Sequence, residues 1–65
     1  MWINVGKCLK NAQARKGLSN LELAAKVKKS PQQICRWRNQ PDLKVQTVQS
    51  LCVALDMDIK EFLML

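Results

Sequence analysis

The sequence predicts an all-α fold, a compact domain of five short helices. Three observations support this prediction: the composition, the spacing of apolar residues and the placement of capping residues. The chain is 48% hydrophobic but has only two glycines and two prolines among its 65 residues. It is therefore too apolar for a disordered segment and too poor in turn residues for a small all-β domain. Apolar residues recur at helical spacing, and helix-capping residues precede several of these runs. The length suits one domain, residues 1–65, without linkers or repeats.

The first helix is predicted to begin after Asn4, which can cap it, and to run to about Lys16, where Gly17 stops it. Its basic residues lie off the apolar stripe, so this helix is mainly scaffold. The predicted buried stripe consists of Val5, Cys8, Leu9 and Ala12.

A helix, a tight turn and a second helix are predicted in the middle of the chain. Ser19 followed by Glu22 forms a capping box, because each side chain can bond the backbone N–H of the other residue. Ser30 followed by Gln33 repeats the pattern. Pro31 falls at the first helical position, where its missing N–H costs nothing. Two helix starts about eleven residues apart leave room for a turn of only about three residues.

The two helices, within about residues 20–39, present apolar faces that can close on each other. Ala24 and Ala25 offer small side chains where a steeply crossing helix needs close approach. The predicted contact residues are Leu23 and Val27 on the first helix and Ile34 and Trp37 on the second.

Two more helices are predicted after a loop at residues 39–42. Asp58 with Glu61 supplies a third capping box, for a short last helix. The stripe expected to point inward on the longer helix is Val45, Val48, Leu51, Cys52 and Leu55, and the last helix would add Ile59, Phe62 and Leu63.

Positive charge is concentrated in the first two-thirds of the chain. The formal net charge is +6 and the sequence pI is about 9.7. Residues 1–40 hold nine basic residues and one acidic residue, a net +8, whereas residues 41–65 hold two and four, a net −2. Such a surface favours a polyanion at low salt. An ordinary solvated basic surface has the same composition, so charge alone leaves both interpretations open.

The cysteines and the rest of the composition argue against a metal site or an enzyme. Three widely spaced cysteines without any histidine fit neither a zinc site nor a disulfide framework. We expect reduced thiols in a cytoplasmic protein, no membrane span, and no cofactor or small-molecule ligand. The lack of histidine, of a glycine-rich phosphate loop and of paired carboxylates makes catalysis the weakest interpretation.

The chain resembles the phage-repressor-like helix-turn-helix family, typified by the lambda repressor and Cro. The resemblance covers about residues 5–63 and is strongest in three segments. It implies a five-helix lambda-repressor-like DNA-binding domain of bacteriophage or prophage type. The length suggests either a minimal Cro-like regulator or an isolated operator-binding domain. The segments are GLSNLELAAKV from Gly17, SPQQICRW from Ser30 and LCVALDMDIKEF from Leu51.

The chain departs from the family pattern at two places. Lys28 occupies a turn position where the family often has glycine, so a non-glycine residue is expected at positive φ. Arg38 stands where relatives often carry a glutamate, and Gln13 stands where its arginine partner would be. The internal ion pair is therefore absent, and Arg38 is expected to point outward toward a phosphate.

The resemblance also implies which residues would meet DNA. The second helix of the motif would lie in the major groove, where Gln pairs with adenine and Arg with guanine. Trp37 is expected in the core rather than stacked on bases. The expected base-reading residues are Gln32, Gln33, Arg36 and Pro31. The expected DNA backbone contacts are Asn20, Ser30, Lys28, Lys29, Arg38, Asn39 and Lys44.

One module reads few base pairs, so the resemblance implies a homodimer on a near-palindromic double-stranded operator. Bound there it would occlude a promoter and repress transcription, although activation uses the same docking. The apolar termini, with Met64, Leu65 and Trp2, are candidates for the dimer interface. Alternatively, these termini fold back on their own core.

Two rival binding functions remain. Helix-turn-helix domains also serve as adaptors or antitoxin-like protein-interaction modules, because a fold does not guarantee a function. Loss of a protein contact without loss of DNA affinity on replacing Gln32 and Arg36 would favour that alternative. RNA binding fits the charge, but the sequence lacks the exposed aromatic platform of single-strand readers.

Overall fold

The structure is a computed structural model that describes residues 3–65, and Trp2 lies outside them. Those residues form five helices and no strand, which confirms the predicted all-α class and the predicted order of elements. The helices are α1 (Val5–Lys16), α2 (Asn20–Val27), α3 (Pro31–Arg38), α4 (Val45–Leu55) and α5 (Ile59–Leu63).

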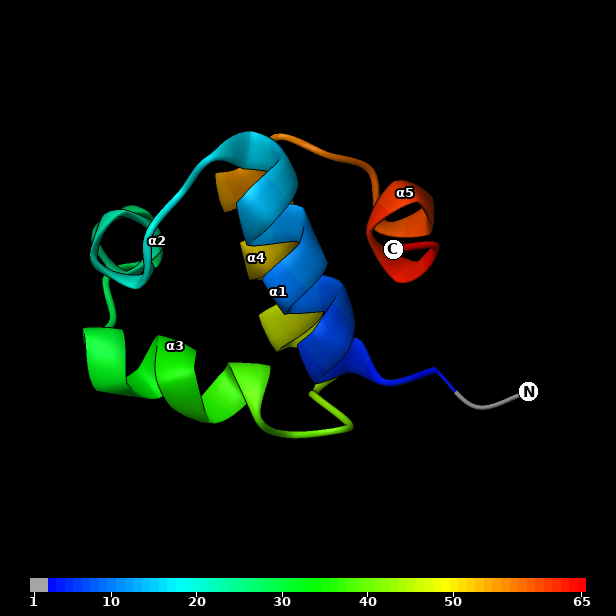
Figure 1. Cartoon of the computed structure of the whole chain (residues 1–65), viewed down its shortest axis with the longest axis horizontal. Helices are drawn as coiled ribbons and strands as arrows, with labels where there is room; N and C mark the ends of the chain where they lie inside the picture. Colours follow the sequence, from blue (N-terminus) through cyan, green and yellow to red (C-terminus); the bar gives the residue numbers. More distant parts are fainter. Residues whose placement is uncertain (1–2) are drawn as a thin grey trace.

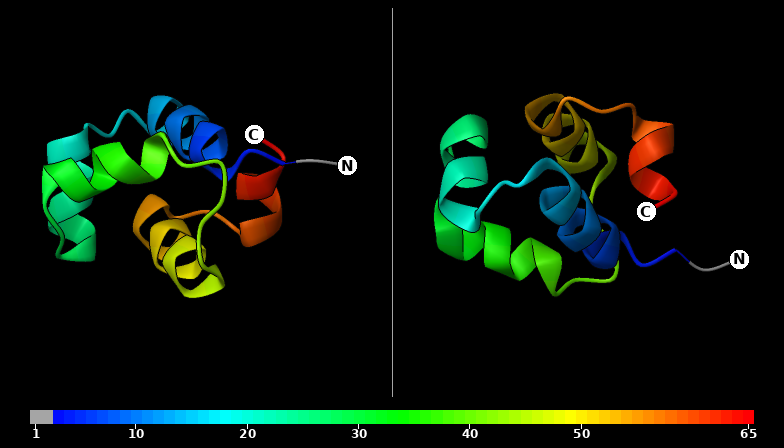
Figure 2. Two further views of the ribbon diagram at one scale, coloured as in Figure 1. Left: turned by 90° about the horizontal axis from the view of Figure 1, so that it is seen from below. Right: turned by 45° about the horizontal axis from the view of Figure 1, so that its top comes forward.

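The helices pack around α1, which contacts α3, α4 and α5, while α2 contacts α3 and α4. Figure 1 shows α3 along the lower edge of the molecule, with α2 beside its start and α4 behind α1. The two further views in Figure 2 keep α2 and α3 on one side and α5 on the other. The helix-turn-helix therefore forms one side of the domain, and α5 closes the opposite side.

The helix ends follow local hydrogen bonds that the sequence predicted. Asn4 Oδ1 accepts the backbone N–H of Lys7 at 3.0 Å. Gly17 ends α1 with a φ of 68°, in the left-handed region that glycine adopts without strain. Ser19 Oγ accepts the Glu22 N–H at 3.1 Å, and Glu22 Oε1 accepts the Ser19 N–H at 3.2 Å. These bonds confirm the predicted cap of α1 and the capping box of α2.

The other two predicted capping boxes are not complete. Ser30 Oγ accepts the Gln33 N–H at 3.2 Å, but within residues 3–65 only α2 has the return bond of a full box. Asp58 precedes α5 without any side-chain cap bond, so the third predicted box is wrong. The Asp58 carboxylate is exposed and can remain hydrated, whereas α5 is anchored by Phe62, which is fully buried.

The core is built from one or more residues of every helix. The predicted stripe of α1 is buried throughout, and Met57 joins the core from the loop before α5. Each large side chain buried in this way contributes roughly 1.5 to 3 kcal/mol relative to exposure. The largest fully buried residues are Phe62, Leu9, Leu23, Ile34, Leu51 and Leu55.

Some predicted core positions lie at the surface instead. Val45 is 66% exposed, because it belongs to the first turn of α4, where that helix leaves the loop and precedes the buried Val48. Ala24 is buried but Ala25 is exposed, so of the two only Ala24 lies in the core. Val27 is half-buried at the end of α2.

The start of α1 lies directly against the end of α3. A Cβ atom at Gly6 would clash with the Gln40 carbonyl oxygen and would lie 2.6 Å from that of Arg38 and 2.9 Å from that of Trp37. The Val5 N–H also donates to Pro41 O at 2.9 Å. The missing side chain at Gly6 therefore lets α1 support the carboxyl end of α3, and this contact positions α3 on the domain.

Candidate nucleic-acid interface

The turn between α2 and α3 has the strained conformation that the sequence indicated. Lys28 has φ 59° and ψ 43°, in the left-handed region. Its N–H and that of Lys29 bond back to the last turn of α2, the latter reaching Ala24 O at 2.9 Å. The expected positive φ at Lys28 is therefore confirmed, and a non-glycine residue there costs of order 1 kcal/mol.

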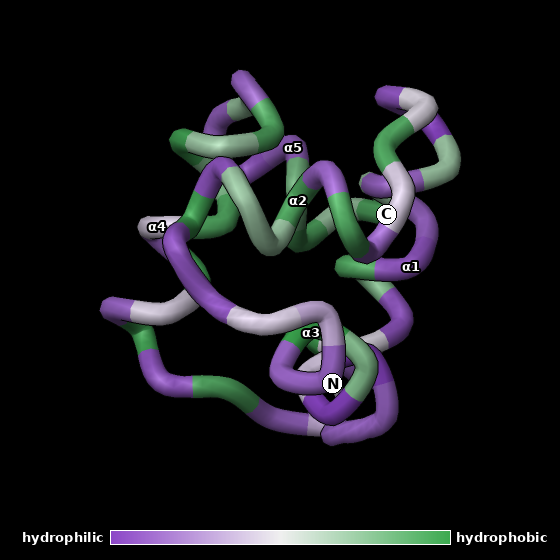
Figure 3. Tube along the Cα trace, turned by 90° about the vertical axis from the view of Figure 1, so that its left-hand side faces the viewer, coloured by the Kyte–Doolittle hydropathy of each residue, from purple (hydrophilic) through white to green (hydrophobic). Residues whose placement is uncertain are grey.

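The helix α3 has an exposed side and a side held by the domain. Ile34 is fully buried, whereas Gln32 and Arg36 are exposed. Two further candidates for base reading, Pro31 and Gln33, are half-buried. Figure 3 shows that hydrophilic residues predominate along α3. The four candidate base-reading residues thus share one eight-residue helix whose inner side is fixed by the core.

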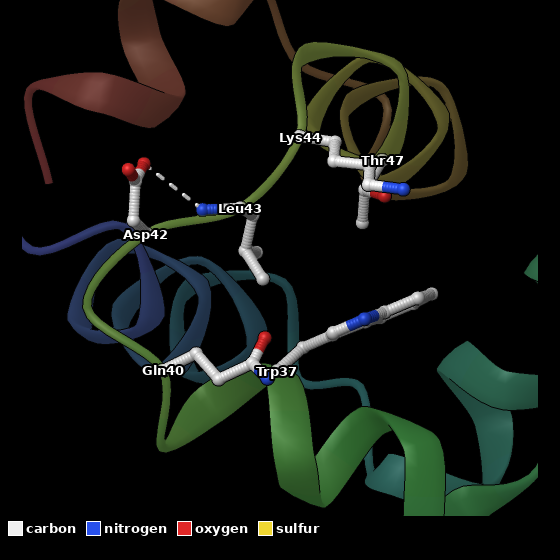
Figure 4. A pocket seen from close by; sticks show the side chains of 6 residues that line it. All are labelled: Trp37, Gln40, Asp42, Leu43, Lys44 and Thr47. Atoms are coloured by element: carbon white, nitrogen blue, oxygen red, sulfur yellow. Dashed lines mark hydrogen bonds between the residues drawn. The ribbon is translucent and has the colours of Figure 1, made fainter.

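Trp37 is half-buried rather than fully enclosed. Its side chain packs against the core, as predicted, but also forms one wall of a groove between α3 and the start of α4. Figure 4 shows the indole reaching across this groove toward Thr47 and Leu43. The groove measures about 560 Å³ and is lined by Trp37, Gln40, Asp42, Leu43, Lys44 and Thr47.

The candidate backbone contacts surround α3. Lys28, Lys29, Ser30, Asn39 and Lys44 are exposed. The Asn39 Nδ2 donates to the Cys35 carbonyl oxygen at 2.9 Å, and Lys44 occupies the N-cap position of α4. Five of the seven candidates therefore have free access to solvent, and the remaining two, Asn20 and Arg38, are half-buried.

Arg38 does not simply point outward as expected. Its Nη1 donates to Asn20 Oδ1 at 2.7 Å, and Gln13 Nε2 donates to the same oxygen at 3.0 Å. Positions 13 and 38, where relatives often have an ion pair, are thus joined here through the neutral side-chain amide of Asn20. Asn20, the common partner of Gln13 and Arg38, was not predicted from the sequence.

Two features of this surface were not identified from the sequence. Gly6 fixes the end of α3 against α1, and Gln13 is 3% exposed while carrying two hydrogen bonds. A glycine within an otherwise helical stripe was the signal for close backbone approach. A glutamine beside a predicted core stripe gave no comparable signal.

The apolar candidates for a dimer interface differ in their exposure to solvent. Met64 is 87% exposed, whereas Leu65 packs against the core and its carbonyl oxygen accepts Asn11 Nδ2 at 2.7 Å. The alternative of a chain end folded on its own core therefore describes Leu65, but not Met64. Other large apolar side chains exposed on the described surface are Ile3, Leu21, Val45 and Val53.

The three cysteines are free thiols, with Cys8 and Cys52 buried and Cys35 exposed on α3. Burial raises the pKa of the Cys8 thiol, and burial followed by the nearby Asp58 carboxylate raises that of Cys52. Within residues 3–65, no group of three potential metal-binding side chains comes together. None of the helices in this part of the chain is long and apolar enough to cross a membrane.

Comparison with known proteins agrees with this geometry. Residues 9–65 match the Cro/C1-type HTH DNA-binding domain. No curated protein matches the chain. Among solved structures, the restriction-modification controller protein C.AhdI from Aeromonas hydrophila is similar, with 23% sequence identity, 92% of each chain covered and a TM-score of 0.79.

A second solved structure, FeII HppE in complex with substrate, shares 15% identity and a TM-score of 0.81. The similarity covers 97% of this chain but only 36% of HppE. Identities this low indicate a shared fold and nothing about activity. The match over residues 9–65 together with the observed helices confirms the predicted resemblance: the chain belongs to the Cro/C1-type helix-turn-helix DNA-binding family.

Proposed function

We propose that this protein is a transcription regulator that binds a near-palindromic DNA operator as a homodimer, with α3 in the major groove. The observation that carries the proposal is the exposure of Gln32 and Arg36 on a helix whose Ile34 is fully buried. A rigid helix with polar side chains on its free side suits the major groove, which admits an α-helix.

Base reading is assigned to Gln32, Gln33 and Arg36, with Pro31 contacting bases at the start of α3. A glutamine can donate and accept together at adenine, and an arginine can donate twice to guanine, each worth roughly 1 to 3 kcal/mol of discrimination. Backbone contacts that set the register are assigned to Asn20, Lys28, Lys29, Ser30, Arg38, Asn39 and Lys44.

Repression is the proposed outcome, as in a Cro-like regulator, because a small domain on an operator acts most simply by occluding a promoter. Two copies would place their α3 helices on half-sites about one helical turn, roughly 34 to 36 Å, apart. Met64, which is 87% exposed, is the proposed centre of the dimer contact, and Leu65 and Trp2 are assigned to the same interface.

Selection of bound sequences from a random duplex pool tests this function. We expect a palindromic consensus whose half-site changes with Gln32→Ala or Arg36→Ala, at a cost of roughly 1 to 3 kcal/mol. Gln49→Ala, on the exposed side of α4, is the matched control and should leave the consensus unchanged. Recovery of no consensus, or one that both α3 variants leave intact, would contradict the proposal.

The dimer is tested separately by sedimentation equilibrium with and without the selected duplex. Met64→Asp should weaken self-association without unfolding the domain, since the side chain is 87% exposed. An association constant that Met64→Asp does not change would remove this residue from the interface. A protein that stays monomeric even on the duplex would contradict the homodimer.

A further inference from the structure

Three polar side chains from three helices meet behind α3. Asn20 Oδ1 accepts Arg38 Nη1 at 2.7 Å and Gln13 Nε2 at 3.0 Å, and the same Nε2 donates to Leu18 O at 3.3 Å. The bridge thereby links the middle of α1, the first residue of α2 and the last residue of α3. We call Gln13, Asn20 and Arg38 the amide bridge.

The bridge leaves the charge of Arg38 uncompensated. Within residues 3–65 the only ion pair joins Arg15 and Glu61 at 4.0 Å, so no carboxylate there lies within that distance of Arg38. Arg38 is half-buried, and removing a charged side chain partly from water is unfavourable unless an anion lies near. The charge is therefore available to an anion from outside the domain.

The guanidinium also keeps donors free for such an anion. Among the described residues, hydrogen bonds account for Nη1 only, which leaves Nε and Nη2 to donate. Two adjacent guanidinium N–H groups match a phosphate in bidentate geometry. By contrast, Asn20 Oδ1 is an acceptor, as a phosphate oxygen is, so the direct backbone contact assigned to Asn20 would use its Nδ2 group while Oδ1 holds Arg38 and Gln13.

The buried end of the bridge supports the same interpretation. Gln13 is 3% exposed, and its Oε1 has no hydrogen-bond partner among the described residues. An unpaired buried oxygen is unfavourable for folding. The domain nevertheless keeps both Gln13 N–H groups directed at Leu18 O and Asn20 Oδ1, which orients the asparagine oxygen toward Arg38.

We propose that Asn20 is a positioning residue that aims the Arg38 guanidinium at a DNA phosphate through a neutral hydrogen bond, so that the full charge of Arg38 acts on the DNA. The inference rests on the proposed function and adds a requirement to it. Position 20 must hold Arg38 without neutralising it, and an acidic side chain there would disable the contact while preserving the fold.

The experiment measures affinity for the selected duplex between 50 and 200 mM salt, together with thermal unfolding. Asn20→Asp should pair with Arg38 and favour the start of α2 electrostatically, so the melting temperature should not fall. Its salt slope should nevertheless decrease by about 0.9, the value for one phosphate contact. Arg38→Gln should lower the slope equally, whereas Arg38→Lys keeps the charge and should retain the slope at reduced affinity.

Gln49→Glu is the matched control, because it changes the net charge as Asn20→Asp does but from the exposed side of α4. It should leave the salt slope unchanged. If Asn20→Asp or Arg38→Gln bound the duplex with the affinity and salt slope of the wild type, this inference alone would be overturned. The bridge would then only support the fold. A wild-type protein that binds no duplex would overturn the proposed function, and this inference with it.

Discussion

The Cβ position of Gly6 lies 2.6 Å from the backbone oxygen of Arg38, so the start of α1 and the end of α3 meet backbone against backbone. Any side chain at Gly6 must displace the carboxyl end of α3. This contact and the amide bridge both act on Arg38, one at its carbonyl oxygen and the other at its side chain. The orientation of α3 thus depends on residues far from the turn of the motif.

Gly6→Ala should therefore lower the free energy of unfolding by about 1 to 3 kcal/mol, the usual range for overpacking, despite the better helix propensity of alanine. Urea unfolding followed by circular dichroism measures the change. Gly17→Ala is the control, because its added Cβ meets no atom within 4 Å and the cost arises only from its φ of 68°. Equal stability of Gly6→Ala and the wild type would show that the two helices are not in this contact.

Lys28→Gly should stabilise the protein by about 1 kcal/mol, because glycine adopts the left-handed conformation without the steric penalty of a Cβ atom. The urea midpoint should rise. Lys28→Ala removes the same charge but keeps the strain at φ 59°, so it should give no such gain. A midpoint that rises equally in both variants would assign the effect to charge rather than to backbone strain.

The N-cap residues of α2 and α5, Ser19 and Asp58, should differ in their contribution to stability. Ser19→Ala removes the Oγ that accepts the Glu22 N–H and should cost about 1 kcal/mol. Asp58→Ala removes no side-chain cap bond and, as an exposed substitution, should change stability by less than about 0.5 kcal/mol. Thermal unfolding of both variants compares them directly, and a larger loss at Asp58 would contradict the observed caps.

The buried thiols should make the protein less stable in alkali. The pKa values of Cys8 and Cys52 are raised from 9.0, so the unfolded chain loses these protons first as pH rises. Their contribution is fully present below pH 9.0 and is lost as pH rises toward the folded pKa values, by at most about 1.4 kcal/mol per thiol per pH unit.

Urea unfolding between pH 7.5 and 10 would measure this dependence. The Cys8→Ala, Cys52→Ala double variant is the reference, because it differs from the wild type only by the two buried thiols. The wild type should lose more stability than this variant above pH 9.0. Parallel pH profiles would indicate that both thiols are as accessible to solvent in the folded protein as in the unfolded chain.

Helix positions could be predicted from the sequence because their signals are local. The caps at Asn4 and Ser19 join residues three apart, and Pro31 and Gly17 act through their own φ angles. Such interactions depend on a few neighbouring residues and form in the same way wherever the helix is packed. The positive φ at Lys28 was instead predicted from the family resemblance, because relatives often have glycine at this position.

The direction of the Arg38 side chain, the exposure of Val45 and the contact at Gly6 were decided by the tertiary structure. Each depends on how far a helix extends beyond its neighbours or on which residue from another helix lies opposite. Arg38 and Asn20 are eighteen residues apart, and they meet only because α2 and α3 pack against each other. Helical periodicity identifies a face of a helix, but the packed core determines what that face contacts.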